Sequence, residues 1–202
     1  SGIESAAIRG LGLAAAGHPD EATAAYDDLA ARLRYGAQAQ RVTMGRGWLQ
    51  LIRDDVDAAR SNLESAVATA GLGGSTRITL WALGWLARVQ FATGDWDTAM
   101  TTVESGRQLA ESSGIVIITP LLELTAAQIH ALRGDWDAAQ TAVRAADVVT
   151  QDYEMVRIPT ILARAQVAEA EADYARVRRV LEPLARMAPG TSLTEPGYWP
   201  WP

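Results

Sequence analysis

The side chains that could do catalytic or metal chemistry are few, and their spacing does not form a site. His18 precedes a proline in a turn, and His130 has no second histidine or carboxylate one helical turn away to complete a zinc site. The acidic run at residues 54–57 lacks the glycine and terminal glutamate of a calcium loop, so we interpret it as a helix cap. The chain has no cysteine and no Gly-x-Ser-x-Gly elbow. We therefore predict a segment that is not an enzyme and holds no metal or cofactor.

Composition narrows the classes of partner. The chain has 202 residues, 49% of them hydrophobic, and its 18 basic residues, all arginines, face 24 acidic ones for a net charge of −6. An acidic chain without a basic face is not typical of nucleic-acid binding, so we expect no direct contact with nucleic acid. No apolar run is long enough to span a membrane, so we expect no membrane partner. The lack of cysteine favours a cytoplasmic location.

A short phrase recurs along the chain and predicts the fold. The sequence Gly-Asp-Trp-Asp-Thr-Ala at residues 94–99 returns at residues 134–139 as Gly-Asp-Trp-Asp-Ala-Ala. Weaker copies begin at residues 17, 54 and 172, so the five starts are separated by 37, 40, 40 and 38 residues. Spacing of this regularity indicates five repeated units rather than one irregular domain.

Each unit is predicted to be a helix, a tight turn and a second helix. Leu83, Leu86 and Val89 lie at helical spacing before Gly94, which ends the first helix, and Asp95 follows where a carboxylate caps the next one. We therefore predict an all-α solenoid, a right-handed superhelix of about five pairs within residues 1–190, followed by a Pro- and Trp-rich tail. The expected units span about 3–36, 39–71, 75–113, 116–150 and 155–188, with the tail at 191–202, the start of a further repeat.

The units resemble the tetratricopeptide repeat (TPR). When Gly94 is taken as repeat position 15, six residues match the positions that are small or apolar in the family. They are Leu83, Leu86, Ala87, Ala99, Val103 and Gly106. The fourth unit departs from the pattern at Glu123, which stands where Leu83 stands in the third. The proline that usually closes a unit is missing, and the period exceeds the family's usual length of about 34 residues.

The resemblance implies a concave groove lined by the first helix of each unit. Ring faces can stack on a ligand there, and arginine and glutamine can supply directed hydrogen bonds. The candidate ligand-binding residues on this face are Arg41, Met44, Trp48, Trp81, Trp85, Arg88, Gln128 and Gln166. The alternative is that Trp48 and Trp81 fill gaps between units while Arg88 and Gln128 are solvated. Three rings that follow the turns, Trp96, Trp136 and Tyr174, are instead predicted to pack between the two helices of their own units.

The long, Ala- and Arg-rich units also resemble the helical-repeat region of the large ATP-dependent LuxR-type (MalT-like) transcription regulators. The tail phrase Pro-Gly-Tyr-Trp-Pro-Trp at residues 196–201 is similar to one that begins a late repeat in those proteins. This resemblance implies that the chain is a segment of a larger protein with neighbouring ATPase and DNA-binding modules. It also implies a sensor function, in which a small-molecule effector, for example a saccharide, binds in the groove.

Two functions therefore remain open at this stage. The first is the sensor domain of such a regulator, and the alternative is a scaffold whose groove binds a peptide or another protein domain. A sugar site requires stacked tryptophans and several hydrogen-bonding groups in one enclosed pocket, whereas a peptide groove runs open across several units.

Overall fold

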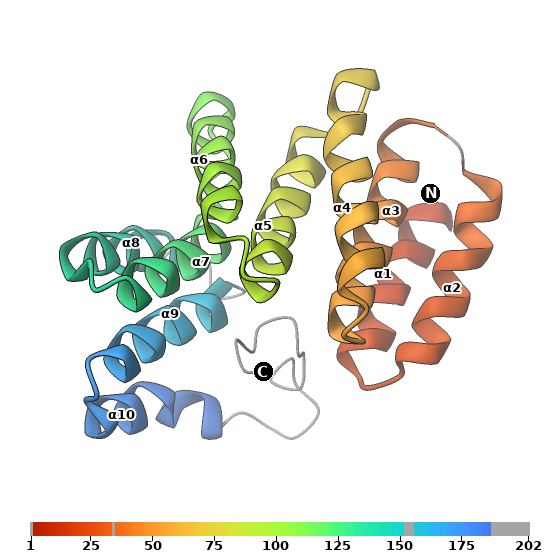
Figure 1. The fold of residues 1–202 in the computed structure, drawn as a ribbon. Helices are drawn as coiled ribbons and strands as arrows, with labels where there is room; N and C mark the ends of the chain where they lie inside the picture. Colours follow the sequence, from red (N-terminus) through yellow and green to blue (C-terminus); the bar gives the residue numbers. More distant parts are fainter. Residues whose placement is uncertain (1, 34, 152–155, 187–202) are drawn as a thin grey trace.

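The computed structural model describes residues 2–33, 35–151 and 156–186, and helices account for nearly all of them (Figure 1). No helix within these ranges combines the length and apolar character needed to cross a bilayer. The tail at 191–202 lies outside the described residues. The helices are α1 (Gly2–Ala15), α2 (Pro19–Arg32), α3 (Gly36–Ile52), α4 (Val56–Ala68), the short 3₁₀ helix η1 (Thr69–Leu72), α5 (Thr76–Ala92), α6 (Trp96–Ser113), α7 (Thr119–Leu132), α8 (Trp136–Thr150), α9 (Arg157–Ala170) and α10 (Tyr174–Ala185).

The helices pack in consecutive pairs, and the pairs stack on one another. The pairs are α1 with α2, α3 with α4, α5 with α6, α7 with α8, and α9 with α10. The first helices also contact one another along the stack, α1 to α3, α3 to α5, α5 to α7 and α7 to α9. We call these five the first-helix layer. The prediction of an all-α solenoid of helical repeats is confirmed.

Every pair turns through the same backbone conformation. The residue aligned at each turn has a positive φ: Gly17 at 84°, Gly94 at 80° and Gly134 at 77°, but also Asp54 at 62° and Ala172 at 58°. Glycine adopts this left-handed region without a steric penalty, whereas residues with a Cβ do so at a cost. The turn geometry is therefore kept even in the two units that have lost the glycine.

The side chain of the residue after the turn caps the second helix in three of the five pairs. The cap predicted at Asp95 is wrong, because the Asp95 side chain makes no capping hydrogen bond to α6, and His18 makes none to α2. Side-chain oxygens of Asp55 and Asp135 each accept a hydrogen bond of 3.3 Å from the backbone N–H three residues later, and Asp173 accepts one of 2.9 Å. These bonds satisfy amide groups that have no partner within the helix. The interpretation of the 54–57 run as a helix cap is confirmed at Asp55.

Glycines allow the helices of the first two pairs to approach closely. The ring of Tyr26, on α2, is 1% exposed and its hydroxyl donates to the carbonyl oxygen of Ala7 at 3.3 Å. A Cβ added at Gly45, on α3, would lie 2.6 Å from that hydroxyl, and one at Gly10, on α1, would lie 2.9 Å from the ring. Three helices therefore meet at one aromatic ring because two of them lack a side chain there.

Glu123, the departure from the TPR pattern, forms a buried ion pair. Arg107 of α6 donates from Nε and Nη2 to the two carboxylate oxygens of Glu123 of α7, at 2.8 and 2.6 Å. The Glu123 side chain is 3% exposed and that of Arg107 is 35% exposed. A two-pronged charged contact between neighbouring units thus replaces the apolar contact usual at this position.

The prediction for the rings after the turns is right for Trp96 and wrong for Trp136 and Tyr174. Trp96 stacks on Phe91 with a centroid separation of 5.9 Å, and its Nε1 donates to the Phe91 carbonyl at 3.3 Å. Trp136 is 41% exposed and Tyr174 is 69% exposed. The reason lies in the preceding helix, because the residues that align with Phe91 in units four and five are alanine and glutamate. Those helices offer no ring for an aromatic side chain to pack against.

Candidate functional site

The eight candidate residues lie on four helices of the first-helix layer. Arg41, Met44 and Trp48 are on α3, and Trp81, Trp85 and Arg88 are on α5, while Gln128 is on α7 and Gln166 on α9. Arg41, Trp81 and Gln166 are half-buried and the other five are buried. The structure brings five of these residues into two groups, one polar and one aromatic. Arg41, Met44 and Trp81 belong to neither group.

The polar group is a ladder of hydrogen bonds across three repeats. Arg88 donates from Nη1 to Gln128 Oε1 at 2.8 Å, and Gln128 donates from Nε2 to Gln166 Oε1 at 3.0 Å. The three residues occupy the same repeat position, 40 and 38 residues apart in the chain. Arg88 and Gln128 are 3% and 4% exposed, so the alternative that they are solvated is wrong. We call these three residues the polar ladder.

Arg88 is a buried cation with few partners. Its guanidinium carbon lies 4.9 Å from the centroid of the Phe91 ring, and its Nε has no hydrogen-bond partner. Among the described residues no carboxylate pairs with it. Burial lowers the pKa of Arg88 from its usual value to about 10 because the charged form is poorly solvated there. A buried charge without a counterion disfavours the folded state, so this residue calls for an explanation other than stability.

The aromatic group is a pair of tryptophans beside the ladder. The Trp48 and Trp85 ring centroids are 6.1 Å apart with a tilt of 48°, and each residue is 4% exposed. The rings therefore pack on one another between α3 and α5, as the gap-filling alternative expects for Trp48. The indole N–H of Trp48 has no hydrogen-bond partner, although a buried tryptophan usually finds one.

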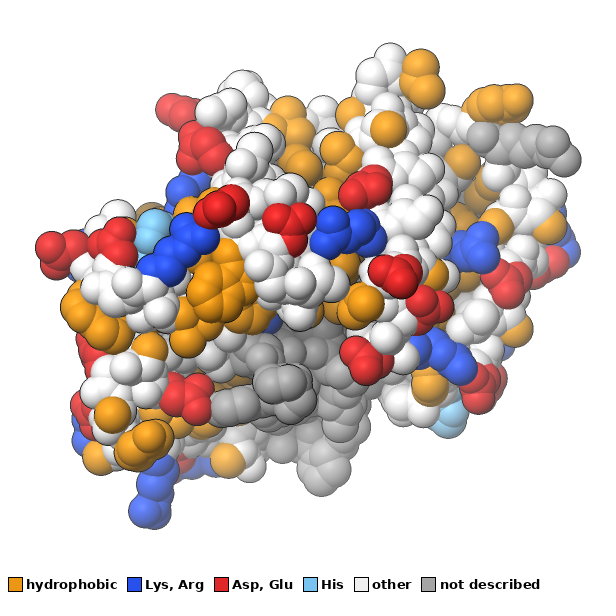
Figure 2. Space-filling model, in the orientation of Figure 1, with side chains coloured by type: hydrophobic (Ala, Val, Ile, Leu, Met, Phe, Trp, Pro, Cys, Tyr) orange, Lys and Arg blue, Asp and Glu red, His pale blue; other side chains and the backbone are white. Residues whose placement is uncertain are grey.

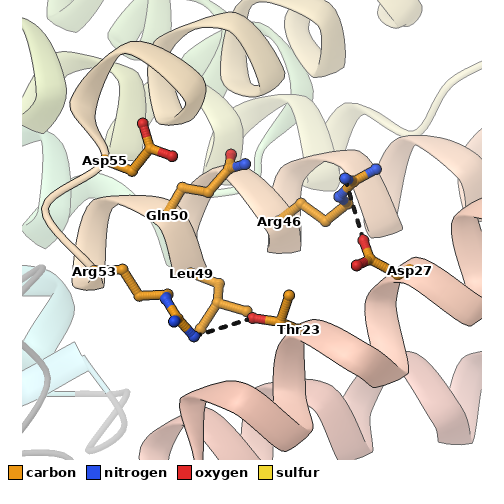
Figure 3. Close-up of a pocket in the computed structure, with 7 residues that line it drawn as sticks. All are labelled: Thr23, Asp27, Arg46, Leu49, Gln50, Arg53 and Asp55. Atoms are coloured by element: carbon orange, nitrogen blue, oxygen red, sulfur yellow. Dashed lines mark hydrogen bonds and ion pairs between the residues drawn. The ribbon is translucent and has the colours of Figure 1, made fainter.

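A polar cleft of about 320 Å³ lies between α2, α3 and the start of α4, and none of the eight candidate residues lines it (Figure 3). Arg46 pairs with Asp27 at 3.2 Å, and Arg53 pairs with Asp20 at 2.6 Å. Asp55, which also lines the cleft, caps α4. Its charged side chains are thus engaged with one another or with the backbone, and we regard the cleft as a joint between repeats.

Similar cross-repeat ion pairs recur at later joints and were missed in the sequence. Arg60 reaches Asp95 at 3.5 Å, and Arg133 reaches Asp97 at 2.7 Å. Figure 2 shows acidic and basic side chains lying side by side on the face that it draws. The signal available in the sequence was the separation of the partners by about one repeat length.

The two histidines have carboxylate neighbours but no metal-binding arrangement. His18 lies 3.2 Å from Glu21, and His130 lies 3.4 Å from Asp135. Within the described part of the chain, no three histidine or carboxylate side chains converge so that they could hold a metal ion.

Comparison with known protein families gives a match at the two units that contain Arg88 and Gln128 of the polar ladder. The sequence model of the tetratricopeptide repeat family matches residues 80–105 and 120–145. These two units are TPR-like repeats. Arg88 and Gln128 occupy the same place in the two matched segments. A comparison with curated proteins finds no match.

Proposed function

We propose that this chain is a non-catalytic scaffold that binds a peptide segment of another protein along its first-helix layer. TPR-like repeats are typical of modules for protein–protein interaction. The observation that carries the proposal is the polar ladder, which extends across three repeats rather than closing into one pocket. A linear run of amide and guanidinium groups is suited to an extended chain, whose own amides repeat along its length.

The charge of Arg88 indicates the group that such a peptide would place there. Its unpartnered Nε requires an acceptor, and its uncompensated charge favours an anionic one. An aspartate or glutamate side chain of the partner supplies both. Because Arg88 is 3% exposed, binding requires the first helices to separate locally. A solenoid permits this movement because each unit contacts only its neighbours.

A second candidate is the small-molecule sensor region of a LuxR-type regulator, with a saccharide as effector and ATPase and DNA-binding modules as neighbours in a cytoplasmic parent protein. The unit spacing of 37 to 40 residues and the phrase at residues 196–201 favour it. It ranks second because Trp48 and Trp85 cover one another, which leaves neither ring face open to stack on a sugar.

The test is a binding screen on the whole chain, with its tryptophan fluorescence and melting temperature as the two readouts. Acidic peptides, their amide counterparts and a set of oligosaccharides are compared, since a ligand that binds only the native state raises the melting temperature. We expect acidic peptides to bind, and Arg88→Met to abolish binding while the helix content is kept. Arg144→Met is the matched control, because Arg144 is exposed on α8. A saturable response to a saccharide alone would favour the sensor, and binding that survives Arg88→Met would overturn the proposal.

A further inference from the structure

The joint between the third and fourth repeats holds an arginine against a ring and a carboxylate. Arg133, which directly follows α7, lies with its guanidinium carbon 6.0 Å from the centroid of the Trp96 ring. Its Nη2 donates to Asp97 Oδ1 at 2.7 Å. Trp96 and Asp97 are the first two residues of α6. The arginine of one repeat is therefore bound at the turn of the repeat before it, through a cation–π contact and an ion pair.

The same ring and carboxylate recur one repeat later, but the arginine does not. Trp136 and Asp137 are the first two residues of α8, and the turn before them has the same left-handed glycine as the turn before α6. The residue that aligns with Arg133 is Glu171, which directly follows α9. Glu171 pairs with Arg176 of its own repeat at 2.7 Å. The fifth repeat therefore supplies no cation to the ring and carboxylate of the fourth.

Both side chains of this second ring and carboxylate are accessible. Trp136 is 41% exposed, and Asp137 is also exposed. Within the part of the chain that the structure describes, no cation or second ring lies against the Trp136 indole, and no ion pair includes Asp137. Figure 2 shows acidic side chains beside hydrophobic ones on the α8 side of the molecule (left). The fourth repeat thus presents to solvent the two groups that hold Arg133 in the third.

We propose that Trp136 and Asp137 bind an arginine side chain of a partner protein. A planar guanidinium can stack on an indole face while its N–H groups reach a carboxylate, whereas a lysine ammonium is a point charge. Arg133 binds the equivalent pair at the same end of a second helix, so the helix dipole acts alike on both sites. A basic segment of another protein is favoured over a second copy, because two copies that each carry −6 repel one another. The site lies on α8, apart from the first-helix layer, and does not depend on the proposed function.

The experiment is an NMR titration of the whole ¹⁵N-labelled chain, in which each of the seven tryptophans gives one indole N–H signal and Trp136→Phe assigns that of Trp136. The probes are capped glycine-flanked peptides of arginine, lysine or citrulline, the neutral isostere of arginine. We expect the arginine peptide to shift the Trp136 signal saturably, the lysine peptide to bind about threefold more weakly and the citrulline peptide not to bind. Asp137→Asn should weaken binding about threefold, the effect of losing one exposed ion pair. Asp57→Asn is the matched control, because Asp57 is the aligned, exposed aspartate of the second repeat but follows Val56 rather than a ring.

A further variant tests the comparison between the two repeats. Arg133→Ala empties the occupied copy, so the Trp96 signal, which should not respond in the wild type, should begin to shift with the arginine peptide. The proposal is overturned if the Trp136 signal does not respond, if the arginine and lysine peptides bind equally, if Asp57→Asn and Asp137→Asn have equal effects, or if Trp96 stays silent in Arg133→Ala. A Trp136 signal that shifts when the chain alone is concentrated would assign the site to a second copy and overturn the assignment to another protein.

Discussion

The buried ion pair between Arg107 and Glu123 predicts that two single substitutions lower the stability of the protein by very different amounts. Arg107→Ala leaves the Glu123 carboxylate, 3% exposed, without the two donors that now lie 2.8 and 2.6 Å from it. Breaking a buried pair in this way typically costs about 3–5 kcal/mol. For a chain of this length each kcal/mol corresponds to about 2–4 °C, so the melting temperature should fall by roughly 6–20 °C.

Replacing Glu123 instead of Arg107 should lower the free energy of unfolding much less. Glu123→Leu leaves Arg107, whose side chain is 35% exposed and lies 3.6 Å from Glu104, so its charge stays solvated and paired. Leucine is also the residue at the equivalent position 83, where it is buried. We expect this variant to lie within about 1 kcal/mol of the wild type, because apolar replacement of a buried charge is often neutral or stabilising. The double variant should resemble Glu123→Leu alone.

The assay is thermal and urea unfolding of the four proteins, followed by far-UV circular dichroism and by tryptophan fluorescence. If the two probes give coincident unfolding curves, unfolding is two-state and free energies of unfolding can be calculated. If the curves differ, the midpoints of the unfolding transitions are compared instead, because a solenoid can unfold unit by unit. Equal destabilisation by the two single substitutions would refute the reasoning, since it would mean that the burial of Glu123 does not decide the outcome. A double variant as unstable as Arg107→Ala would refute it as well.

Three further effects are expected. Ala172→Gly should raise the free energy of unfolding by about 0.5–1 kcal/mol in urea titrations, because glycine relieves a φ of 58° at a turn where other units already have it. Gly45→Ala should lower it by about 1–3 kcal/mol, since the new Cβ would lie 2.6 Å from the hydroxyl of the buried Tyr26. The penalty for burying charged Arg88 should shrink as the pH rises above about 10, where the native state has released a proton that the unfolded chain still holds. The gap in melting temperature between wild type and Arg88→Met should therefore shift in favour of the wild type from pH 9 to 11, and an unchanged gap would contradict this.

The repeated phrase predicts the helix pairs well because turn chemistry is local. A left-handed residue followed by a capping aspartate acts within a few residues, so spacing alone locates each turn. The alignment placed even Asp54 and Ala172 at such turns, although neither residue indicates one by itself. Side-chain environment was harder to predict, because it depends on the neighbouring helix. Trp96 is packed because it stacks on Phe91 in the helix before the turn, whereas Trp136 is exposed because its unit has no such ring.

The sequence was sufficient to place the candidate site residues on one face of the solenoid, but it was not sufficient to predict their contacts. Equivalent repeat positions put Arg88, Gln128 and Gln166 in one column, and the structure joins them by hydrogen bonds. Their burial depends on how closely successive first helices approach, which no single unit encodes. For the same reason the partner of Glu123, 16 residues earlier and across a loop, could not be identified.

Hydrogen-bond satisfaction separates two kinds of polar residue in the first-helix layer. Gln40 is 1% exposed and fully engaged: its Nε2 donates to the Ala66 carbonyl at 2.9 Å and to Thr79 Oγ1 at 2.8 Å, while its Oε1 accepts from the Ser75 N–H at 2.7 Å. A buried group whose partners are all supplied by the fold is explained by the fold. Arg88 is as deeply placed yet keeps an idle donor and an unbalanced charge. A structural role alone would favour an apolar side chain there, so the presence of Arg88 supports the proposed role in which a partner molecule supplies the missing acceptor.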